Sequence, residues 1–304
     1  MNLRHFVGAI SRQVKEVFGS AHGDPELQKW ISDNLSFIKS LRERPNERSF
    51  IESVQVHREI VLDALSKQGE IERKLRTFTE EFDRFASFET RRRRGLPVEW
   101  SDRYACLDDK SSSTSFDRHY TYHPAWAARA LQKIRPSKHV DISSILNFST
   151  LVSAFCPVEF YDFRPALIEL PGLYCGTADL TALPFATDSI QSLSCMHVLE
   201  HIGLGRYGDS LNVDGDLKAI SELLRVTAPG GNLLIVVPVG KARVQFNAHR
   251  IYDAAEFIEY FTGTVLVESA LIEDSGSNGI ILNPSNAQFR SQVYGCGCFW
   301  FRKS

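Results

Sequence analysis

The chain has 304 residues, of which 43% are apolar and 11% aromatic, and its formal net charge is −2. This length allows one sizeable core with a smaller appended unit, while the near-neutral charge gives no overall field for a polyanion, so no nucleic-acid partner is expected. No segment approaches the roughly 20 continuous apolar residues of a membrane span, and the N-terminus has no uninterrupted hydrophobic stretch with a cleavage site, so we expect a cytoplasmic protein.

The N-terminal part of the chain, residues 1–95, is predicted to be helical. Residues 4–18 carry apolar side chains at helical spacing with basic residues among them. Such a helix can pack on protein or lie on a membrane surface, so peripheral membrane contact stays open. The pair Asp24 and Pro25 is typical of a helix start, which predicts a helix over 25–42.

A second, longer helix is expected from Asn46 to about Thr90. Its apolar residues alternate by three and four, with two polar interruptions, at Val54, His57, Val61, Ala64, Gln68, Ile71, Leu75, Phe78, Phe82 and Phe85. Such a seam must be buried, either within a helical hairpin or in a coiled coil that joins two chains as a homodimer. The run Arg91–Arg94 fits a solvated linker or an anionic partner, and it predicts a junction to a second domain over 96–304.

In the second domain, residues 122–134 predict a helix, after which short apolar runs alternate with amphipathic stretches. Candidate strands cover 138–142, 158–162, 172–176, 190–196, 231–238, 264–272 and 292–301. Strands separated by helices imply right-handed crossovers, and the last two strands are expected to be antiparallel. The predicted fold is therefore α/β, a Rossmann-like doubly wound seven-stranded sheet preceded by an α-helical hairpin or coiled-coil region.

Acidic residues recur at the ends of the predicted strands. Asp141, Asp162 and Asp179 follow three of them, and Met196 and His197 end the fourth. Open sheets of this type bind ligands beyond the carboxyl ends of their strands, where the strand order reverses. We therefore expect the binding site at this edge of the sheet.

Between about Phe116 and Phe261, a set of motifs resembles a known family. The motifs are FDRHYTYHPAWAARAL, YDFRP, LPF, HVLEHIGLGRYGD, DGDLKAISELLRVTAPGG, PVG and FNAHRIY. The chain resembles class I methyltransferase-like proteins of bacteria and nematodes, a family of uncharacterised function often linked to polysaccharide biosynthesis. The resemblance implies a Rossmann-like fold, S-adenosylmethionine as cofactor, and a saccharide or glycan-linked acceptor.

With S-adenosylmethionine as ligand, each strand-end residue has a task. Asp162 is expected to accept both ribose hydroxyls, and Asp179, with the backbone at Leu180, to bind adenine. Asp141 and Ser143 are expected to hold the amino-acid end through the first loop. Met196 and His197 complete the predicted cofactor set.

The first loop departs from the class I pattern Asp-x-Gly-x-Gly. The corresponding positions are Asp141, Ile142, Ser143, Ser144 and Ile145. Glycine serves there because the backbone approaches the ligand closely, and isoleucine does not accept a positive φ without strain. The alternative function is therefore a non-catalytic scaffold that assembles partners through its helical arm.

Two polar clusters are candidates for chemistry on an acceptor hydroxyl. Methyl transfer needs alignment of donor and acceptor and a base for the acceptor proton, for which His201 is the first choice. The predicted catalytic set is His201, Asp209 and His249, and the predicted acceptor-binding set is Arg206, Tyr207, Asn247, Arg250 and Tyr252.

Two further histidines, His119 and His123, lie close together in the sequence. His119, Tyr120 and His123 are expected either to fold over the cofactor as a lid or to form a surface turn. Neither their spacing nor the alternation of Cys296 and Cys298 matches a compact zinc or iron signature, so no metal site is predicted.

Overall fold

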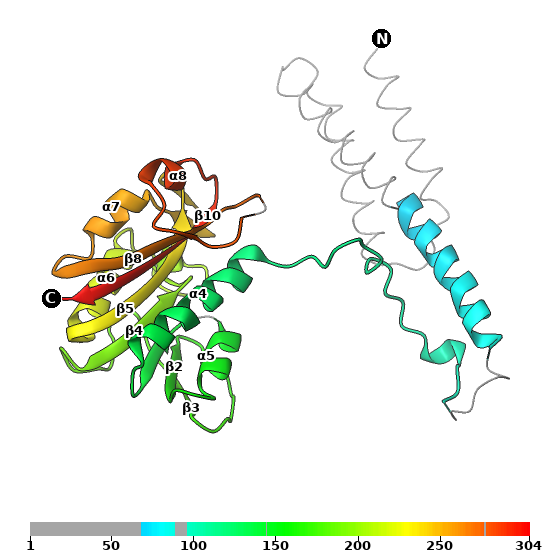
Figure 1. Ribbon diagram of the computed structural model, residues 1–304, viewed down its shortest axis with the longest axis horizontal. Helices are drawn as coiled ribbons and strands as arrows, with labels where there is room; N and C mark the ends of the chain where they lie inside the picture. Colours follow the sequence, from blue (N-terminus) through cyan, green and yellow to red (C-terminus); the bar gives the residue numbers. More distant parts are fainter. Residues whose placement is uncertain (1–67, 89–95, 144, 277) are drawn as a thin grey trace, which may run out of the picture. The chain divides into compact units, whose positions relative to one another are not determined.

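The computed structural model describes residues 68–88, 96–143, 145–276 and 278–304 (Figure 1). The chain divides into two compact units, the first ending at Thr114 and the second spanning Ser115–Ser304. This division lies further along the chain than the predicted junction after residue 95. The predicted helices over 4–18 and 25–42, the first part of the heptad seam and the arginine run all lie outside the described residues.

In the first unit, residues 68–86 form a helix, which agrees with the last part of the predicted seam. Two of its aromatic side chains, Phe78 and Phe82, pack on Trp100, with ring centroids 6.1 and 4.8 Å away. Trp100 begins the short 3-10 helix η3 (Trp100–Asp102). These seam residues therefore contact their own chain, and the homodimer stays a prediction. Within the described residues, no helix is long and apolar enough to cross a membrane.

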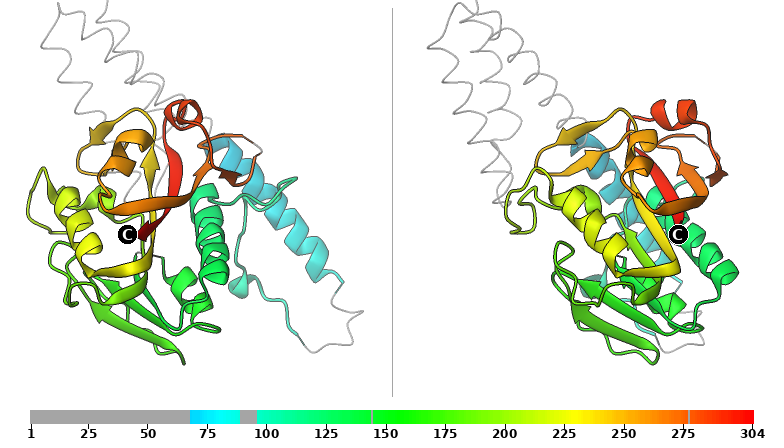
Figure 2. Two further views of the ribbon diagram at one scale, coloured as in Figure 1. Left: turned by 60° about the vertical axis from the view of Figure 1, so that its left-hand side comes forward. Right: turned by 90° about the vertical axis from the view of Figure 1, so that its left-hand side faces the viewer.

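The second unit contains one large sheet with the strand order β3-β2-β1-β4-β5-β10-β8-β9 (Figures 1 and 2). Its strands are β1 (His139–Ile142), β2 (Val158–Asp162), β3 (Leu173–Thr177), β4 (Ile190–Met196), β5 (Thr227–Val239), β8 (Thr264–Ile272), β9 (Ile281–Leu282) and β10 (Gly295–Lys303). Neighbouring strands from β3 to β5 are parallel, and β10 is antiparallel to both β5 and β8. The strand order reverses between β1 and β4, which makes the sheet doubly wound.

Helices cover both faces of this sheet. They are α4 (Arg118–Ile134), α5 (Leu146–Val152), α6 (Gly215–Val226), α7 (Ala254–Glu259) and α8 (Asn286–Arg290), with the 3-10 turn η4 (Leu199–His201) after β4. Along β5, Leu233 and Ile235 pack in one buried cluster with α6 and α7, while Leu234 and Val236 pack in the other with α4 and α5. Burial on both faces explains why residues 233–239 of β5 are apolar without interruption.

The sequence predicted most of these elements. The strands over 158–162, 190–196 and 264–272 have the predicted bounds, and the antiparallel last pair is confirmed. The helix predicted over 122–134 begins four residues earlier, because the Asp117 side chain accepts a hydrogen bond from the Tyr120 backbone N–H and caps it. A two-stranded hairpin, β6 (Arg243–Gln245) and β7 (His249–Ile251), was not predicted.

Candidate functional site

A cleft of about 430 Å³ opens at the carboxyl ends of β1 to β4. Its lining follows the strands in turn: Ile142 and Ser143 after β1, Tyr161–Arg164 after β2, Ala178–Thr181 after β3, His197, Val198 and His201 after β4, and the segment 207–212. We call it the strand-end cleft. It lies at the point where the strand order reverses, as predicted, and its volume falls within the usual range of about 300–1,000 Å³ for small-molecule sites.

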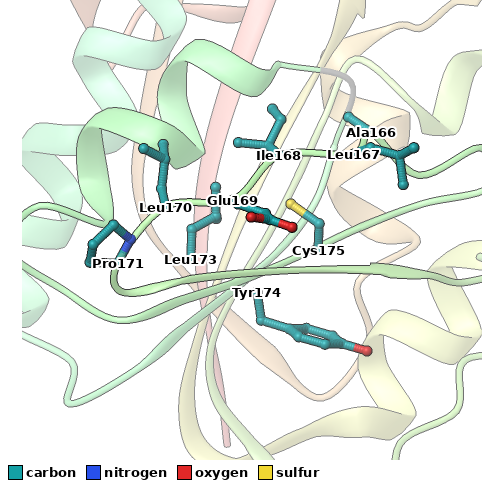
Figure 3. Close-up of a pocket in the computed structure, with 9 residues that line it drawn as sticks. All are labelled: Ala166, Leu167, Ile168, Glu169, Leu170, Pro171, Leu173, Tyr174 and Cys175. Atoms are coloured by element: carbon teal, nitrogen blue, oxygen red, sulfur yellow. The ribbon is translucent and has the colours of Figure 1, made fainter.

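A second hollow borders the opposite end of β3 (Figure 3). The segment 166–171 and the first residues of β3 line it, and Glu169 supplies its one carboxylate. The predicted site residues lie elsewhere. A lone carboxylate among mainly apolar side chains offers no set of groups for catalysis, so the strand-end cleft is the candidate site.

Asp162 and Asp179 stand on the rim of the strand-end cleft, where each stabilises its own turn. Asp162 Oδ1 accepts the Arg164 backbone N–H at 2.7 Å, and Asp179 Oδ1 accepts the Thr181 backbone N–H at 2.8 Å. Among the described residues, the Oδ2 atoms of both carboxylates have no hydrogen-bond partner. Two carboxylates on neighbouring strand ends thus keep acceptor oxygens available for a ligand, while Leu180 is buried and lines the cleft between them.

Asp141 does not line the cleft. It lies inside β1 rather than after it and is fully buried. The Ser149 hydroxyl donates to its Oδ2, and the Ser194 hydroxyl donates to its Oδ1 at 2.5 Å. Burial raises the pKa of Asp141 to about 7, although both serine hydrogen bonds oppose this rise. Asp141 was predicted to contact the cofactor, but it lies in the buried polar core and does not reach the cleft.

The serine-containing first loop avoids the strain expected at Ile145. Ile145 has a φ of −105°, and its side chain packs in the buried cluster with Trp126 and Phe148 instead of entering the cleft. Ser143 lines the cleft; its hydroxyl donates to the Met196 carbonyl at 3.2 Å and accepts the Ile145 backbone N–H at 3.3 Å. The loop thus passes the cleft without bulk from Ile145, while the Met196 side chain is buried in the core.

His201 occupies the cleft beyond β4 in a defined tautomer. Its Nδ1 lies 2.7 Å from the Ala248 carbonyl oxygen, which can only accept, so Nδ1 carries the proton and Nε2 keeps a lone pair. Nε2 lies 3.8 Å from a carboxylate oxygen of the buried Glu200, and the Tyr207 ring packs edge-on against the imidazole at 5.6 Å. A proton taken by Nε2 would be stabilised by Glu200, which is the arrangement that a general base requires.

Asp209 holds together the loop that closes one side of the cleft. Its carboxylate accepts backbone N–H groups of Gly203 (2.7 Å), Gly205 (3.3 Å) and Tyr207 (3.3 Å). Burial alone would raise the pKa of Asp209, but these backbone hydrogen bonds hold it below its ordinary value. Gly203 is required here because its φ is +81° and an added Cβ would lie 2.1 Å from the Asn212 carbonyl oxygen. Asp209 therefore organises the loop, and its predicted role as a catalytic base has no support in this geometry.

Two guanidinium groups lie near the Tyr207 ring. Arg164 and Arg206 place theirs 4.6 and 5.1 Å from the ring centroid. Arg206 also donates to the Ala248 carbonyl at 3.1 Å, the same oxygen that binds His201. Tyr207 and Arg164 line the cleft, so an aromatic face and a cation are available to a polar acceptor. Arg164 was not predicted as a site residue, because the sequence shows only that it lies in the turn after β2.

The second predicted polar cluster lies outside the lining of the cleft. Arg250 is buried; its guanidinium donates to the carbonyls of Ile202 at 2.6 Å and Val213 at 3.1 Å, and it lies 3.5 Å from Asp216. The Tyr252 hydroxyl donates to Asp216 at 3.0 Å. Both predicted acceptor-binding roles are corrected, because these side chains are buried supports of the loop over 202–213.

The β6–β7 hairpin carries the other two predicted residues. His249 pairs through Nε2 with the Gln245 side chain at 2.6 Å, and burial lowers its pKa. Asn247 is exposed in the turn. Neither lines the strand-end cleft, so their predicted roles in catalysis and acceptor binding stay predictions.

His197 ends β4 and meets the first turns of α4. It has a left-handed φ of 55°, and its Nδ1 donates to Glu200 Oε1 at 2.8 Å. Burial lowers the pKa of His197, but Glu200 and Cys296 outweigh this effect and raise it to about 10. Burial lowers the pKa of His119 to about 4 and that of His123 to about 2. The segment expected to form either a lid or a surface turn lies in the first turns of α4, where its rings pack on His197, with Tyr120 stacked on it at 5.4 Å.

Fold and cleft together define the class as Rossmann-like α/β: a doubly wound sheet with an antiparallel last pair and a ligand-sized cleft at the strand-order reversal. Residues 183–284, less than half of the chain, match the family described as Caenorhabditis protein of unknown function, DUF268. No curated protein sequence matches the chain.

Solved structures of methyltransferases are similar to about three fifths of this chain. The N-methyltransferase NodS from Bradyrhizobium japonicum WM9, in complex with S-adenosyl-L-homocysteine, is 16% identical, with a TM-score of 0.39 over 61% of this chain and 95% of that one. The 1,6-didemethyltoxoflavin-N1-methyltransferase from Burkholderia thailandensis, bound to 1,6-didemethyltoxoflavin and S-adenosylhomocysteine, is 13% identical, with a TM-score of 0.42 over 62% and 80%. At these scores the likeness carries no argument, and the class rests on the strand order and the cleft.

Proposed function

We propose that this chain is an S-adenosylmethionine-dependent methyltransferase with its cofactor in the strand-end cleft. The observation that carries the proposal is the pair Asp162 and Asp179. They stand at neighbouring strand ends, and among the described residues the Oδ2 atom of each has no hydrogen-bond partner. Ribose hydroxyls and the adenine amino group are donors, and they match these acceptors. The bound cofactor supplies an electrophilic methyl group on a sulfonium sulfur.

His201 is the proposed base for a hydroxyl acceptor. With the cofactor bound, its sulfonium sulfur would be the leaving group for the methyl carbon that the acceptor oxygen attacks, and His201 Nε2 would accept the hydroxyl proton. Nδ1 cannot take this proton because it already donates to Ala248. A saccharide or glycan-linked acceptor is the class that the sequence resemblance implies, and the Tyr207 face with Arg164 supports it, because aromatic faces and cations suit polar rings that carry anionic groups.

A replacement at Asp162 tests the proposal. Asp162→Asn keeps the Oδ1 acceptor for the Arg164 N–H but turns the other oxygen into an amide donor, so ribose loses its acceptor. We expect S-adenosylhomocysteine affinity, measured by calorimetry on the full chain, to fall by about tenfold to a hundredfold. Asp188→Asn is the matched control, because Asp188 is an exposed carboxylate just before β4, at the opposite end of the sheet, paired with Lys303.

The first loop favours a second candidate, a non-catalytic scaffold. The two class I glycines are replaced by Ser143 and Ile145. The same calorimetry separates the two functions. A scaffold gives no binding heat with S-adenosylmethionine or S-adenosylhomocysteine, and the methyltransferase gives saturable heat with both.

A further inference from the structure

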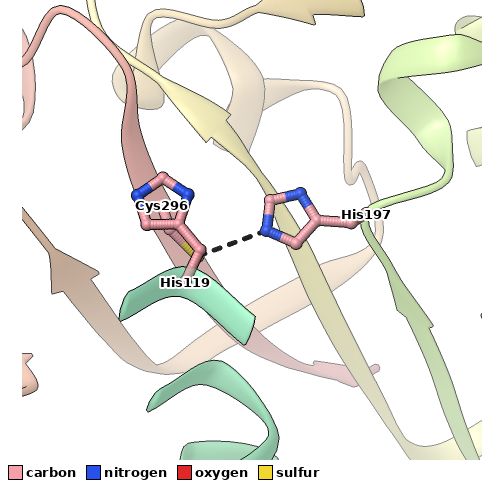
Figure 4. Close-up of side chains that lie close together, drawn as sticks. All are labelled: His119, His197 and Cys296. Carbon is pink, nitrogen blue, oxygen red and sulfur yellow. Dashed lines mark hydrogen bonds between the residues drawn. The ribbon is translucent and has the colours of Figure 1, made fainter. Parts of the chain in front are cut away.

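Three side chains with metal-binding atoms meet beside the strand-end cleft (Figure 4). His119 comes from the first turn of α4, His197 from the end of β4 and Cys296 from β10. One nitrogen of each imidazole and the Cys296 sulfur all lie within 4.8 Å of one another. Because three distant segments supply them, their spacing along the chain gave no metal signature.

The separation of two of these atoms fits a metal centre. His197 Nε2 lies 3.6 Å from Cys296 Sγ. In a tetrahedral zinc site, with Zn–S of about 2.3 Å and Zn–N of about 2.0–2.1 Å, a sulfur and a nitrogen ligand are about 3.5 Å apart. His119 is half-buried in the first turn of α4, and one of its ring nitrogens lies within 4.8 Å of the other two ligand atoms.

Glu200 provides the outer support that metal-bound histidines normally have. Its Oε1 accepts His197 Nδ1–H at 2.8 Å, so Nε2 is the ring nitrogen that faces the Cys296 sulfur and that would bind a metal once its proton is displaced. A carboxylate behind a ligating histidine fixes the tautomer and raises the basicity of the ligand. The Glu200 carboxylate, the His197 imidazole and the proposed metal position therefore lie next to one another in that order.

His123 adds an independent sign of a missing polar partner. Its side chain is fully buried, its Nδ1 bonds the His119 carbonyl at 2.6 Å, and its Nε2 has no partner among the described residues. Its ring centroid lies 5.0 Å from that of His197. A buried nitrogen without a hydrogen-bond partner destabilises the folded state, and a metal-bound water can donate to it and remove this cost.

A Cys–His–Glu nucleophile is the other chemistry that this contact suggests. Cys296 has no exposed surface, and burial raises the pKa of its thiol well above the ordinary value. A nucleophile must touch its substrate, and a fully enclosed sulfur cannot. The third converging group, His119, has no task in such a triad but is a natural metal ligand.

We infer that His119, His197 and Cys296 bind one zinc-class divalent cation, with a water in the fourth position facing His123. Three protein ligands and one open position are the pattern of zinc sites that keep a place for water or substrate. The site joins the first turn of α4 to the sheet beside the cleft.

Metal content and cobalt spectroscopy on the full chain test this inference. After growth with zinc and removal of weakly bound metal, we expect about one zinc per chain. Cobalt-substituted protein should show the intense visible bands of a four-coordinate site and a sulfur-to-cobalt charge-transfer band in the near ultraviolet. Cys296→Ser should abolish that band, whereas Cys298→Ser, a buried cysteine on the same strand, should keep it.

Two more variants cover the case in which Cys296→Ser fails to fold. His119→Gln changes a half-buried helix position and should fold yet lose stoichiometric metal. Glu200→Gln should lower zinc affinity by about tenfold to a hundredfold. Folded wild-type protein without metal, or equal metal content in the His119→Gln, Cys296→Ser and Cys298→Ser variants, overturns the inference. These readouts are independent of cofactor binding, so a failed methyltransferase proposal does not affect them.

Discussion

Replacing Asp141 by asparagine should remove a pH dependence of stability that this one carboxylate creates. Asp141 is fully buried, and burial raises its pKa from 3.8 to about 7. The folded state therefore binds the proton more tightly than the unfolded state. Protonation of Asp141 therefore stabilises the folded state. This stabilisation is complete below about pH 4 and is lost as the pH rises through about 7.

The size of the effect follows from the pKa shift. About three pKa units correspond to about 4 kcal/mol, because one unit is 1.36 kcal/mol. Of this, about 2.5 kcal/mol falls between about pH 5 and pH 8, where the full chain can be studied. Asparagine keeps an acceptor for Ser194 or Ser149 and does not titrate, so the free energy of unfolding of Asp141→Asn should rise relative to wild type by that amount over this interval.

Native-state hydrogen exchange is the suitable assay. Peptides from β1 and β4 report on the opening of the region around Asp141, and the ratio of variant to wild-type exchange rates cancels the intrinsic pH dependence. Asp188→Asn is the control, because an exposed ion pair contributes only about 0–1 kcal/mol. A variant-to-wild-type difference that is constant from pH 5 to pH 8, or that changes in the opposite direction, would refute the reasoning.

His201→Ala should abolish methyl transfer and leave S-adenosylhomocysteine affinity within about twofold, because the proposed base contacts the acceptor and not the nucleoside. Asp188→Asn, at the opposite end of the sheet, is the control in a transfer assay, and retained turnover in His201→Ala removes His201 from the role. Arg250→Met should destabilise the second unit by about 3–5 kcal/mol, because it leaves the buried Asp216 carboxylate without its cation. Melting curves and exchange in the loop over 202–213 measure this, and unchanged protection there contradicts the supporting role of Arg250.

The centre of the sheet could be predicted because β1, β4 and the second half of β5 are buried on both faces. β4 and β8 have the predicted bounds, since each is a run of mainly apolar residues that ends at polar or glycine-rich turns. The β6–β7 hairpin could not be predicted, because its strands have three residues each and no apolar run. Strand pairing across such a short hairpin depends on tertiary contacts.

The cofactor side of the site was predictable only in part. Asp162 and Asp179 reach the cleft because they stand at or after the last residue of a strand. Asp141 precedes the last residue of β1, and this single position turns its side chain into the core. The nearby serine hydroxyls that receive it come from α5 and β4, which the local sequence does not reveal.

Arg250 and Tyr252 show why a polar cluster in sequence can mislead. Both follow β5, where acceptor-binding residues were expected. Instead, Arg250 pairs with Asp216 and the Tyr252 hydroxyl donates to it, and both side chains support the loop over 202–213. His119 and Cys296 illustrate the converse. They lie far apart in the sequence and meet at His197 only because α4 packs against the strands.

A crystal structure of the full chain with S-adenosylhomocysteine tests the central claim most directly. The account predicts that the ribose hydroxyls contact Asp162, that adenine lies beside Asp179 and Leu180, and that the sulfur faces His201. Density in the hollow over 166–175, or an empty strand-end cleft at saturating ligand, would contradict it.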